Sequence, residues 1–336
     1  MYSSHPQESS LARGDRKIID EVTIMGNGQK MLFRVLLILF AVLVIPLMSP
    51  ALETEDFTVR DLTDQLSDER MFQLTTRAEE QLKKVLDFWA VDSGVNRLGK
   101  IRLEFEKPRA GTYGTVFLMV KEGNVKVRVV RIFGVMEQPQ MVAHKLTHAV
   151  FPSPDKLVRN TMGIPMEVRF GNPLTFPMCG FSHHEWVTVF RRNKSYIPLS
   201  KLGPDHEEWG MTTRQGVPIV LDKAKQHIMY AESGSFGDFL LSTYGMNKVK
   251  RFYKLSAGEK RPWEEVFESS FAELETKWLQ AFDAGPQQEE KNIALLLKMV
   301  KDDPEKACSE AQQLGGKTRP DLSPDPQQKP TRKRKF

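Results

Sequence analysis

The chain has 336 residues, enough for one large domain or for two ordinary domains of about 150 residues each. Apolar residues make up 40% and charged residues 27%, which excludes a coiled-coil rod, a collagen-like repeat, a disordered chain and a multi-span membrane protein. The net charge of +5 comes mainly from the tail after position 303, which has eight Lys or Arg against four Asp or Glu. The body is neutral, so we expect no nucleic-acid partner.

The N-terminal part contains one membrane-directed segment. An apolar run at Val35–Met48 follows basic residues and precedes small ones, as in a secretory signal peptide. Its fourteen residues fall short of the roughly 20 that span a bilayer, although a single retained anchor stays possible as the alternative. We therefore predict a polar extension at 1–30 and a signal peptide or membrane anchor at 31–52, with Met31 as an alternative start. Either interpretation places the protein in the cell envelope, exported and in the second case anchored.

A first predicted lobe alternates helix and strand patterns. Residues 66–91 have apolar positions at spacings of three and four, as in an amphipathic helix. Alternating apolar and polar residues then predict three strands, at 101–105, 115–120 and 125–133. A helix is expected from about 138 to 150, ending before Pro152.

The second predicted half is helical. Residues 153–228 contain scattered Pro and Gly and are interpreted as loop-rich, and helices are expected at 231–244, 246–255 and 263–282. We assign a main domain at 56–283, a C-terminal helix at 287–314 and a disordered basic tail at 315–336. The expected fold class is α+β, with a small mixed sheet and helices followed by a helical C-terminal half. The cysteines, Cys179 and Cys308, are too few for a disulfide framework or a four-cysteine zinc site.

The strongest chemical motif is His144-Lys145-Leu146-Thr147-His148 on the helix that follows the strands. Histidines at i and i+4 share one helix face, so both rings can reach one metal ion. Eighteen residues separate His148 from Glu167, and two histidines with a glutamate form a catalytic type of zinc set. The alternatives are chance histidines and a carboxylate at a helix start. The clusters 183–185 and 206–208 lack this pairing and are interpreted as loop residues that could line a cleft.

These residues resemble the gluzincin metallopeptidases, and more specifically the bacterial peptidase MA-like domains. Those proteins have strands before an HELTH-type helix, then a downstream glutamate, then a helical half. Three later segments are similar to family motifs in order and spacing, namely IPLSKL at 197–202, YAESGSFGDFLLSTYG at 230–245 and FAELETKW at 271–278. The resemblance covers about 60–282. It implies Zn²⁺ held by His144, His148 and Glu167, and it makes Tyr230 a candidate donor to the reaction's oxyanion.

Three positions, in two segments, depart from the family pattern. Lys145 stands where the family has its glutamate general base, a group that contributes roughly 10²–10⁴-fold to rate. The family tryptophan and glycine that flank the downstream glutamate are replaced by Pro165 and Val168. An ammonium at position 145 cannot accept a proton and disfavours a bound cation.

The sequence therefore predicts a metallopeptidase homologue that is degenerate or inactive, with a peptide or protein as its substrate or ligand. The alternative is a non-catalytic peptide-binding or scaffold module of the cell envelope. A third hypothesis is a structural envelope protein whose histidines bind nothing. The sequence leaves the oligomeric state open.

Overall fold

The structure, a computed structural model, describes residues 52–90, 99–108, 114–135, 140–214, 217–256, 261–285 and 288–318. The predicted N-terminal extension and residues 31–51 lie outside these ranges, as do residues 319–336 of the predicted tail. The statements below concern the described residues.

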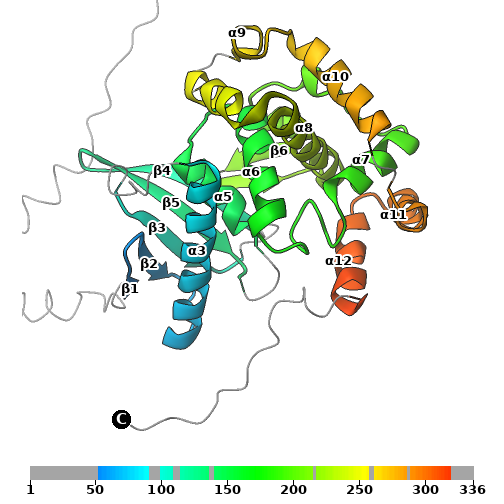
Figure 1. The fold of residues 1–336 in the computed structure, drawn as a ribbon. Coiled ribbons are helices and arrows are strands. Elements are labelled where there is room, and N and C mark those ends of the chain that lie inside the picture. The colour runs from blue at the N-terminus through cyan, green and yellow to red at the C-terminus, as the bar shows by residue number, and fades with distance from the viewer. Residues whose placement is uncertain are drawn as a thin grey trace, which may run out of the picture. The chain divides into compact units, whose positions relative to one another are not determined.

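A mixed five-stranded sheet has the strand order β1-β2-β3-β5-β4 (Figure 1). Its strands are β1 (Leu52–Glu53), β2 (Phe57–Asp61), β3 (Ile101–Glu106), β4 (Gly114–Glu122) and β5 (Val125–Phe133). The neighbours β2, β3 and β5 are parallel, and β4 returns antiparallel to β5. The tight β4–β5 connection contains Gly123 at φ 58°, a conformation that glycine adopts without strain. Because β5 inserts beside β3, β4 is left at the edge of the sheet.

Two helices cover one face of this sheet, α3 (Asp68–Phe88) and α5 (Val142–Val150). Apolar side chains of both helices interlock with inward residues of the strands in one buried cluster, which includes Leu82, Leu103, Phe105, Ile132 and Leu146. Each helix has one apolar face, and packing against the sheet buries that face. The predicted strands and both predicted helices are present, and the expected α+β class is confirmed.

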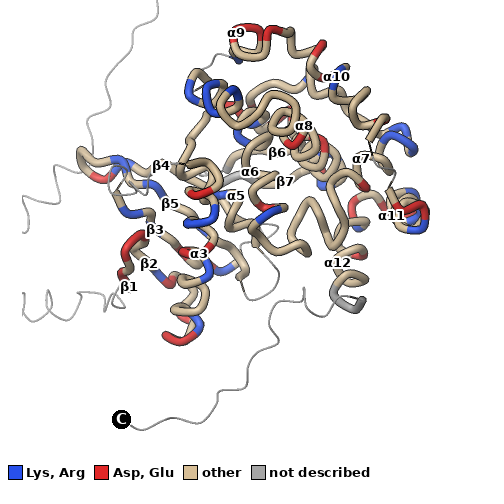
Figure 2. The backbone as a smooth tube through the Cα atoms, viewed as in Figure 1, with Lys and Arg blue, Asp and Glu red and all other residues tan. Residues whose placement is uncertain are grey.

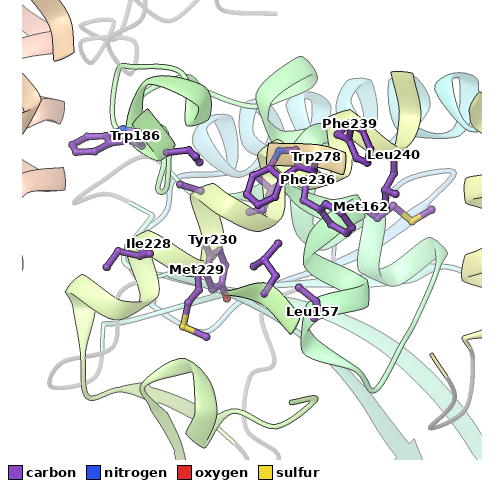
Figure 3. Close-up of a cluster of buried hydrophobic side chains, with 14 of the residues drawn as sticks. Leu157, Met162, Trp186, Ile228, Met229, Tyr230, Phe236, Phe239, Leu240 and Trp278 are labelled. Atoms are coloured by element: carbon purple, nitrogen blue, oxygen red, sulfur yellow. The ribbon is translucent and has the colours of Figure 1, made fainter. Parts of the chain in front are cut away.

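The rest of the described chain is mainly helical and surrounds a second apolar core (Figure 1). Its helices are α6 (Lys156–Phe170), α7 (His183–Arg192), α8 (Lys223–Leu255), α9 (Trp263–Phe267), α10 (Phe271–Ala284), α11 (Glu290–Asp302) and α12 (Ala307–Thr318). Short 3₁₀ turns occupy Leu199–Lys201 and Glu207–Trp209. Figure 3 shows buried aromatic and aliphatic residues of this core, including Trp186, Phe236 and Trp278.

Residues 153–228 are more regular than predicted. They contain α6, α7 and a two-stranded ribbon of β6 (Met211–Arg214) and β7 (Val217–Val220). The loop-rich interpretation depended on the scattered Pro and Gly of this region, but Gly163 and Pro165 lie inside α6 and are buried. The stabilisation gained by burying most of α6 outweighs the low intrinsic helix propensity of glycine and proline.

The later helices also differ in detail from their predicted bounds. Gly245 at φ 76° separates two helical parts of α8, at the gap expected between 244 and 246. The predicted helix 263–282 is broken at Glu268, whose φ is 57°, and α10 restarts with a capping box of Ser270 and Glu273. The predicted C-terminal helix at 287–314 is two helices, α11 and α12. Because α12 extends to Thr318, residues 315–318 are helical and do not belong to a disordered tail.

The expected transmembrane helix is corrected by the structure. No helix among the described residues is long and apolar enough to cross a membrane. Leu52, placed at the end of the predicted membrane segment, instead begins β1 and pairs with Val59 of β2. The remainder of the predicted signal or anchor, 31–51, lies outside the described residues.

Candidate functional site

The two histidines of the HKLTH motif lie together on the buried side of α5. His144 is 0% exposed and His148 is 3% exposed, and their ring centroids are 4.3 Å apart. The i, i+4 spacing on one helix face brings the rings together, as the sequence predicts. Burial lowers the pKa of both rings well below 6.5, with Lys145 adding a repulsive contribution, so both are neutral.

Helix α6 accepts a hydrogen bond from the Nε2 of each ring, whereas the Nδ1 of His144 is buried without a partner among the described residues. His144 Nε2 lies 3.1 Å from Asn160 Oδ1, and His148 Nε2 lies 3.0 Å from the backbone carbonyl oxygen of Arg159. A carbonyl oxygen can only accept, so each Nε2 carries the proton and donates it. Neither Nε2 therefore has a free lone pair for a metal ion.

Gly163 of α6 faces the same two rings. A Cβ atom placed on it would lie 2.7 Å from His144 Nε2 and 2.8 Å from His148 Nε2. Both rings therefore pack directly against Gly163, and only a residue without a side chain fits there.

The Glu167 carboxylate has a different environment. Its Oε2 accepts from the backbone N–H of His144 at 2.9 Å, and its Oε1 accepts from Thr175 Oγ1 at 3.2 Å. Helix α5 begins after Met141, whose side chain makes no capping hydrogen bond, so Glu167 supplies an acceptor for its first turn. The structure thus brings His144 and His148 together and places Glu167 at the helix start.

A zinc site needs three protein ligands whose free lone pairs converge on one point. Here both Nε2 atoms are hydrogen-bond donors to α6, and the Glu167 carboxylate is bonded to other groups. Groups of three His, Cys, Asp or Glu ligand atoms within 4.8 Å of one another are found elsewhere in the described chain, but not among these residues. The arrangement does not fit a zinc ion held by His144, His148 and Glu167.

Three basic residues surround the histidines. Lys145 is only 8% exposed, yet its amine makes no hydrogen bond or ion pair with any residue that the structure describes. Lys156 of α6 is 1% exposed and contacts Met211 Sδ, and its amine lies over the rings of Trp209 and Tyr230. Arg159, one turn further along α6, lies 3.3 Å from His206 through its Nη2.

This environment lowers the pKa of both lysines. Burial lowers the pKa of Lys145 to about 7, with repulsion from Arg159 in the same direction and attraction to Glu167 opposing it. Burial lowers the pKa of Lys156 to about 6, with Arg159 and Lys145 adding to the effect. Burial also raises the pKa of Glu167 to about 7, although the N–H of His144 and the hydroxyl of Thr175 oppose this. The site combines buried cations with a carboxyl that is only partly charged at neutral pH.

Tyr230 of α8 lies beside the site, with its ring centroid 6.1 Å from that of His144. Its side chain is 6% exposed and belongs to the apolar core, where Figure 3 shows it with Met229 and Leu157. Burial raises the pKa of its hydroxyl, which hydrogen bonds to Asn160. Tyr230, the predicted oxyanion donor, therefore lies near the histidines and is linked to His144 through Asn160.

A cavity of about 460 Å³ opens onto these residues. One wall consists of residues 114–118 of edge strand β4, and Lys145, His148, Arg159 and Tyr230 line it from the helices. A volume between 300 and 1,000 Å³ is typical of ligand pockets. Among the described residues its charged lining consists of Lys145, Arg159, Lys223 and one carboxylate, that of Glu305.

The other histidine clusters have separate roles. His183 begins α7 and lies 2.9 Å from Asp238 through Nε2, and Glu185 is the acidic member of the capping box with Ser182. These residues are helical rather than in a loop. His206 lines the cavity, in agreement with a cleft position. Cys179 and Cys308 form a disulfide beside His227. This disulfide joins α12 to the segment after α6.

Sequence reasoning missed Lys156, Arg159 and Asn160, which all lie on α6. Together with Gly163 and Glu167 they recur at spacings of three and four, so they form one polar stripe on an otherwise apolar helix. That stripe was readable from the sequence, but the loop-rich interpretation of this region concealed it.

Comparison of the chain with protein-family models, with curated proteins and with solved structures found no match to any of them.

Proposed function

We propose that this protein is a non-catalytic relative of the gluzincin peptidases that binds an extended peptide segment in the cavity beside β4. The observation that carries the proposal is the junction of an edge strand with a ligand-sized cavity at the HKLTH helix. The peptide-binding alternative thus takes precedence over hydrolysis.

The geometry of β4 supports a peptide ligand. Among the described strands β4 pairs only with β5, and residues 114–118 line the cavity. The outer side of an edge strand presents backbone N–H and C=O groups, and an extended peptide can add there as a further strand. The half-buried side chains of Val116 and Leu118 offer apolar contacts beside that edge.

The histidine geometry supports binding without hydrolysis. Each ring donates Nε2–H to α6, Gly163 offers no ligand, and Glu167 interacts with the start of α5. The position of the family's glutamate base holds Lys145 instead, and the amine of Lys145 makes no hydrogen bond with any described residue. The proposal therefore assigns no covalent step to these residues.

The disulfide supports the proposed location outside the cytoplasm. Cys179 and Cys308 are bonded although 129 positions separate them in the sequence. Structural disulfides persist in oxidising compartments and are rare in reducing ones. We therefore keep an exported location within this proposal.

The test is a binding measurement on the purified full chain. A fluorescein-labelled heptapeptide of alternating valine and threonine with a central glutamate is titrated by anisotropy. A second peptide carries N-methyl groups at alternate residues, which removes the N–H groups needed for strand addition. We expect saturable binding of the first peptide, at least tenfold weaker binding of the second, and full recovery of uncleaved peptide by mass spectrometry.

Two variants on one strand provide the matched comparison. Leu118→Arg changes a residue that lines the cavity, whereas Met119→Arg changes its exposed neighbour, which does not. Only the first should weaken binding. Equal affinities of both variants, or binding that tolerates the N-methyl groups, would show that the peptide does not add to β4.

A further inference from the structure

The three basic residues around HKLTH pose an energetic problem. Arg159 lowers the pKa of both Lys145 and Lys156, and Lys145 adds to the effect on Lys156. Among described residues none of the three has a carboxylate within ion-pair distance of 4.0 Å. Buried cations are normally paired, because an unpaired one loses its hydration without compensation.

Nearby acidic groups do not neutralise this cluster. Asp155 forms its ion pair with Arg261, and Glu167 accepts from the start of α5 and from Thr175. Glu207 interacts with Lys156 only at longer range. The cluster therefore has an excess of positive charge that faces the cavity through Lys145 and Arg159.

Lys145 and Arg159 line the cavity, and His206 connects Arg159 to Lys156. His206 lies between the amine of Lys156 and the guanidinium of Arg159, at 3.5 Å from the first and 3.3 Å from the second. Lys145 is 8% exposed and lines the cavity, and its amine has no hydrogen-bond partner among the described residues. An ammonium and a guanidinium beside one pocket form a receptor for an oxyanion, which both can bind with charge-assisted hydrogen bonds.

We infer that Lys145 and Arg159 form an oxyanion-binding subsite that selects acidic peptides. This inference rests on the proposed function, because the same cavity holds the peptide. The recognised group is a carboxylate or phosphate carried by the peptide, and its charge replaces the missing ion-pair partner of Lys145. Position 145 thus has a binding role in place of the catalytic one that the family pattern gives it.

The experiment compares the glutamate heptapeptide with its glutamine and phosphoserine counterparts on the full chain. Hydrogen bonds to charged groups contribute roughly 1.5–3 kcal/mol, so we expect the glutamate peptide to bind about 10- to 100-fold more tightly than the glutamine peptide. The phosphoserine arm shows which oxyanion is preferred. Lys145→Met should reduce the preference for the acidic peptide to less than twofold, and Lys254→Met, at an exposed lysine outside the cavity lining, should leave it unchanged.

The outcomes separate this inference from the proposed function. If the glutamate and glutamine peptides bind equally well, the peptide site stands and the oxyanion subsite is refuted. If neither binds, the peptide proposal fails, and the subsite is judged with inorganic phosphate alone. Phosphate at matched ionic strength should then raise the thermal midpoint of the wild type but not of Lys145→Met. An equal rise in both proteins, or in neither, would overturn the inference.

Discussion

The convergence of two histidine rings on Gly163 can be tested by adding one methyl group. In Gly163→Ala the new Cβ would lie 2.2 Å from His144 Cδ2 and less than 3.0 Å from both Nε2 atoms. These contacts are far below the van der Waals distance, so both buried rings must move. Moving them lengthens the hydrogen bonds to Asn160 and to the Arg159 carbonyl.

The expected magnitude is the difference between two opposing effects. Alanine is roughly 0.5–1 kcal/mol better than glycine inside a helix. An added carbon in a packed core costs roughly 1–3 kcal/mol. The variant should therefore lose about 1–2 kcal/mol of unfolding free energy, even though helix propensity alone predicts a gain.

Urea unfolding followed by circular dichroism measures this difference. Gly285→Ala is the control, because its Cβ would approach backbone oxygens no closer than 3.3 Å and should change stability by less than about 0.5 kcal/mol. In a His144→Ala background the penalty of Gly163→Ala should shrink, since the nearest ring is gone. A stabilised Gly163→Ala single variant would refute the convergence of the rings on α6.

Four further outcomes follow from the same site. Between pH 7 and 10.5 the unfolded chain holds a proton on Lys145 that the folded chain has lost, so wild-type stability should rise with pH there. Lys156, whose folded pKa is about 6, contributes a slope of the same sign, so Lys145→Met should reduce the slope in urea titrations without abolishing it. The variant should stabilise the protein below pH 7 by at most about 5 kcal/mol, and a gain independent of pH would contradict the assigned cause. For Glu167 the folded pKa of about 7 exceeds the ordinary value of 4.5. Stability should therefore fall as the pH rises from 4.5 to about 7, and Glu167→Gln should flatten that fall. Lys145→Glu should show no chelator-sensitive cleavage of quenched fluorescent peptides, because the histidines and Glu167 do not form a metal site; restored cleavage would reverse that interpretation. Cys179→Ser should lower unfolding free energy by roughly 2–5 kcal/mol and make it insensitive to reductant, whereas a reductant effect that persists would point away from the disulfide to Cys308.

The sequence predicted the parts of this fold that depend on local pattern. Alternation along 125–133 and the apolar stripe of 66–91 reflect burial on one face, and the structure contains the corresponding β5 and α3. Strand β2 and helix α6 escaped prediction. The first is only five residues long, and the second contains a glycine and a proline whose cost is outweighed by burial.

The candidate site was predictable only within one helix. The spacing of His144 and His148 determines that their rings share a face, whatever the rest of the chain does. The position of Glu167 depends on how α6 packs against α5, and its 18-residue separation from His148 leaves that packing undetermined. The disulfide was equally unpredictable, because two cysteines give no spacing pattern to interpret.

Four features of the site, on different elements, all argue against a working metal centre. The family's base position holds a lysine, Gly163 packs closely against both rings, and both rings donate from Nε2 to α6. Glu167, the remaining acidic candidate, interacts with the start of α5. A site that had lost only its base would keep its ligand atoms directed at one point, whereas here both Nε2 atoms and the Glu167 carboxylate make their hydrogen bonds within the protein, and the Nδ1 of His144 is buried without a partner among the described residues. The amine of Lys145 is left as the buried donor that still faces the cavity without a described partner. The chemistry left to this cavity is therefore recognition of negative charge, and the acidic-peptide measurement tests that step directly.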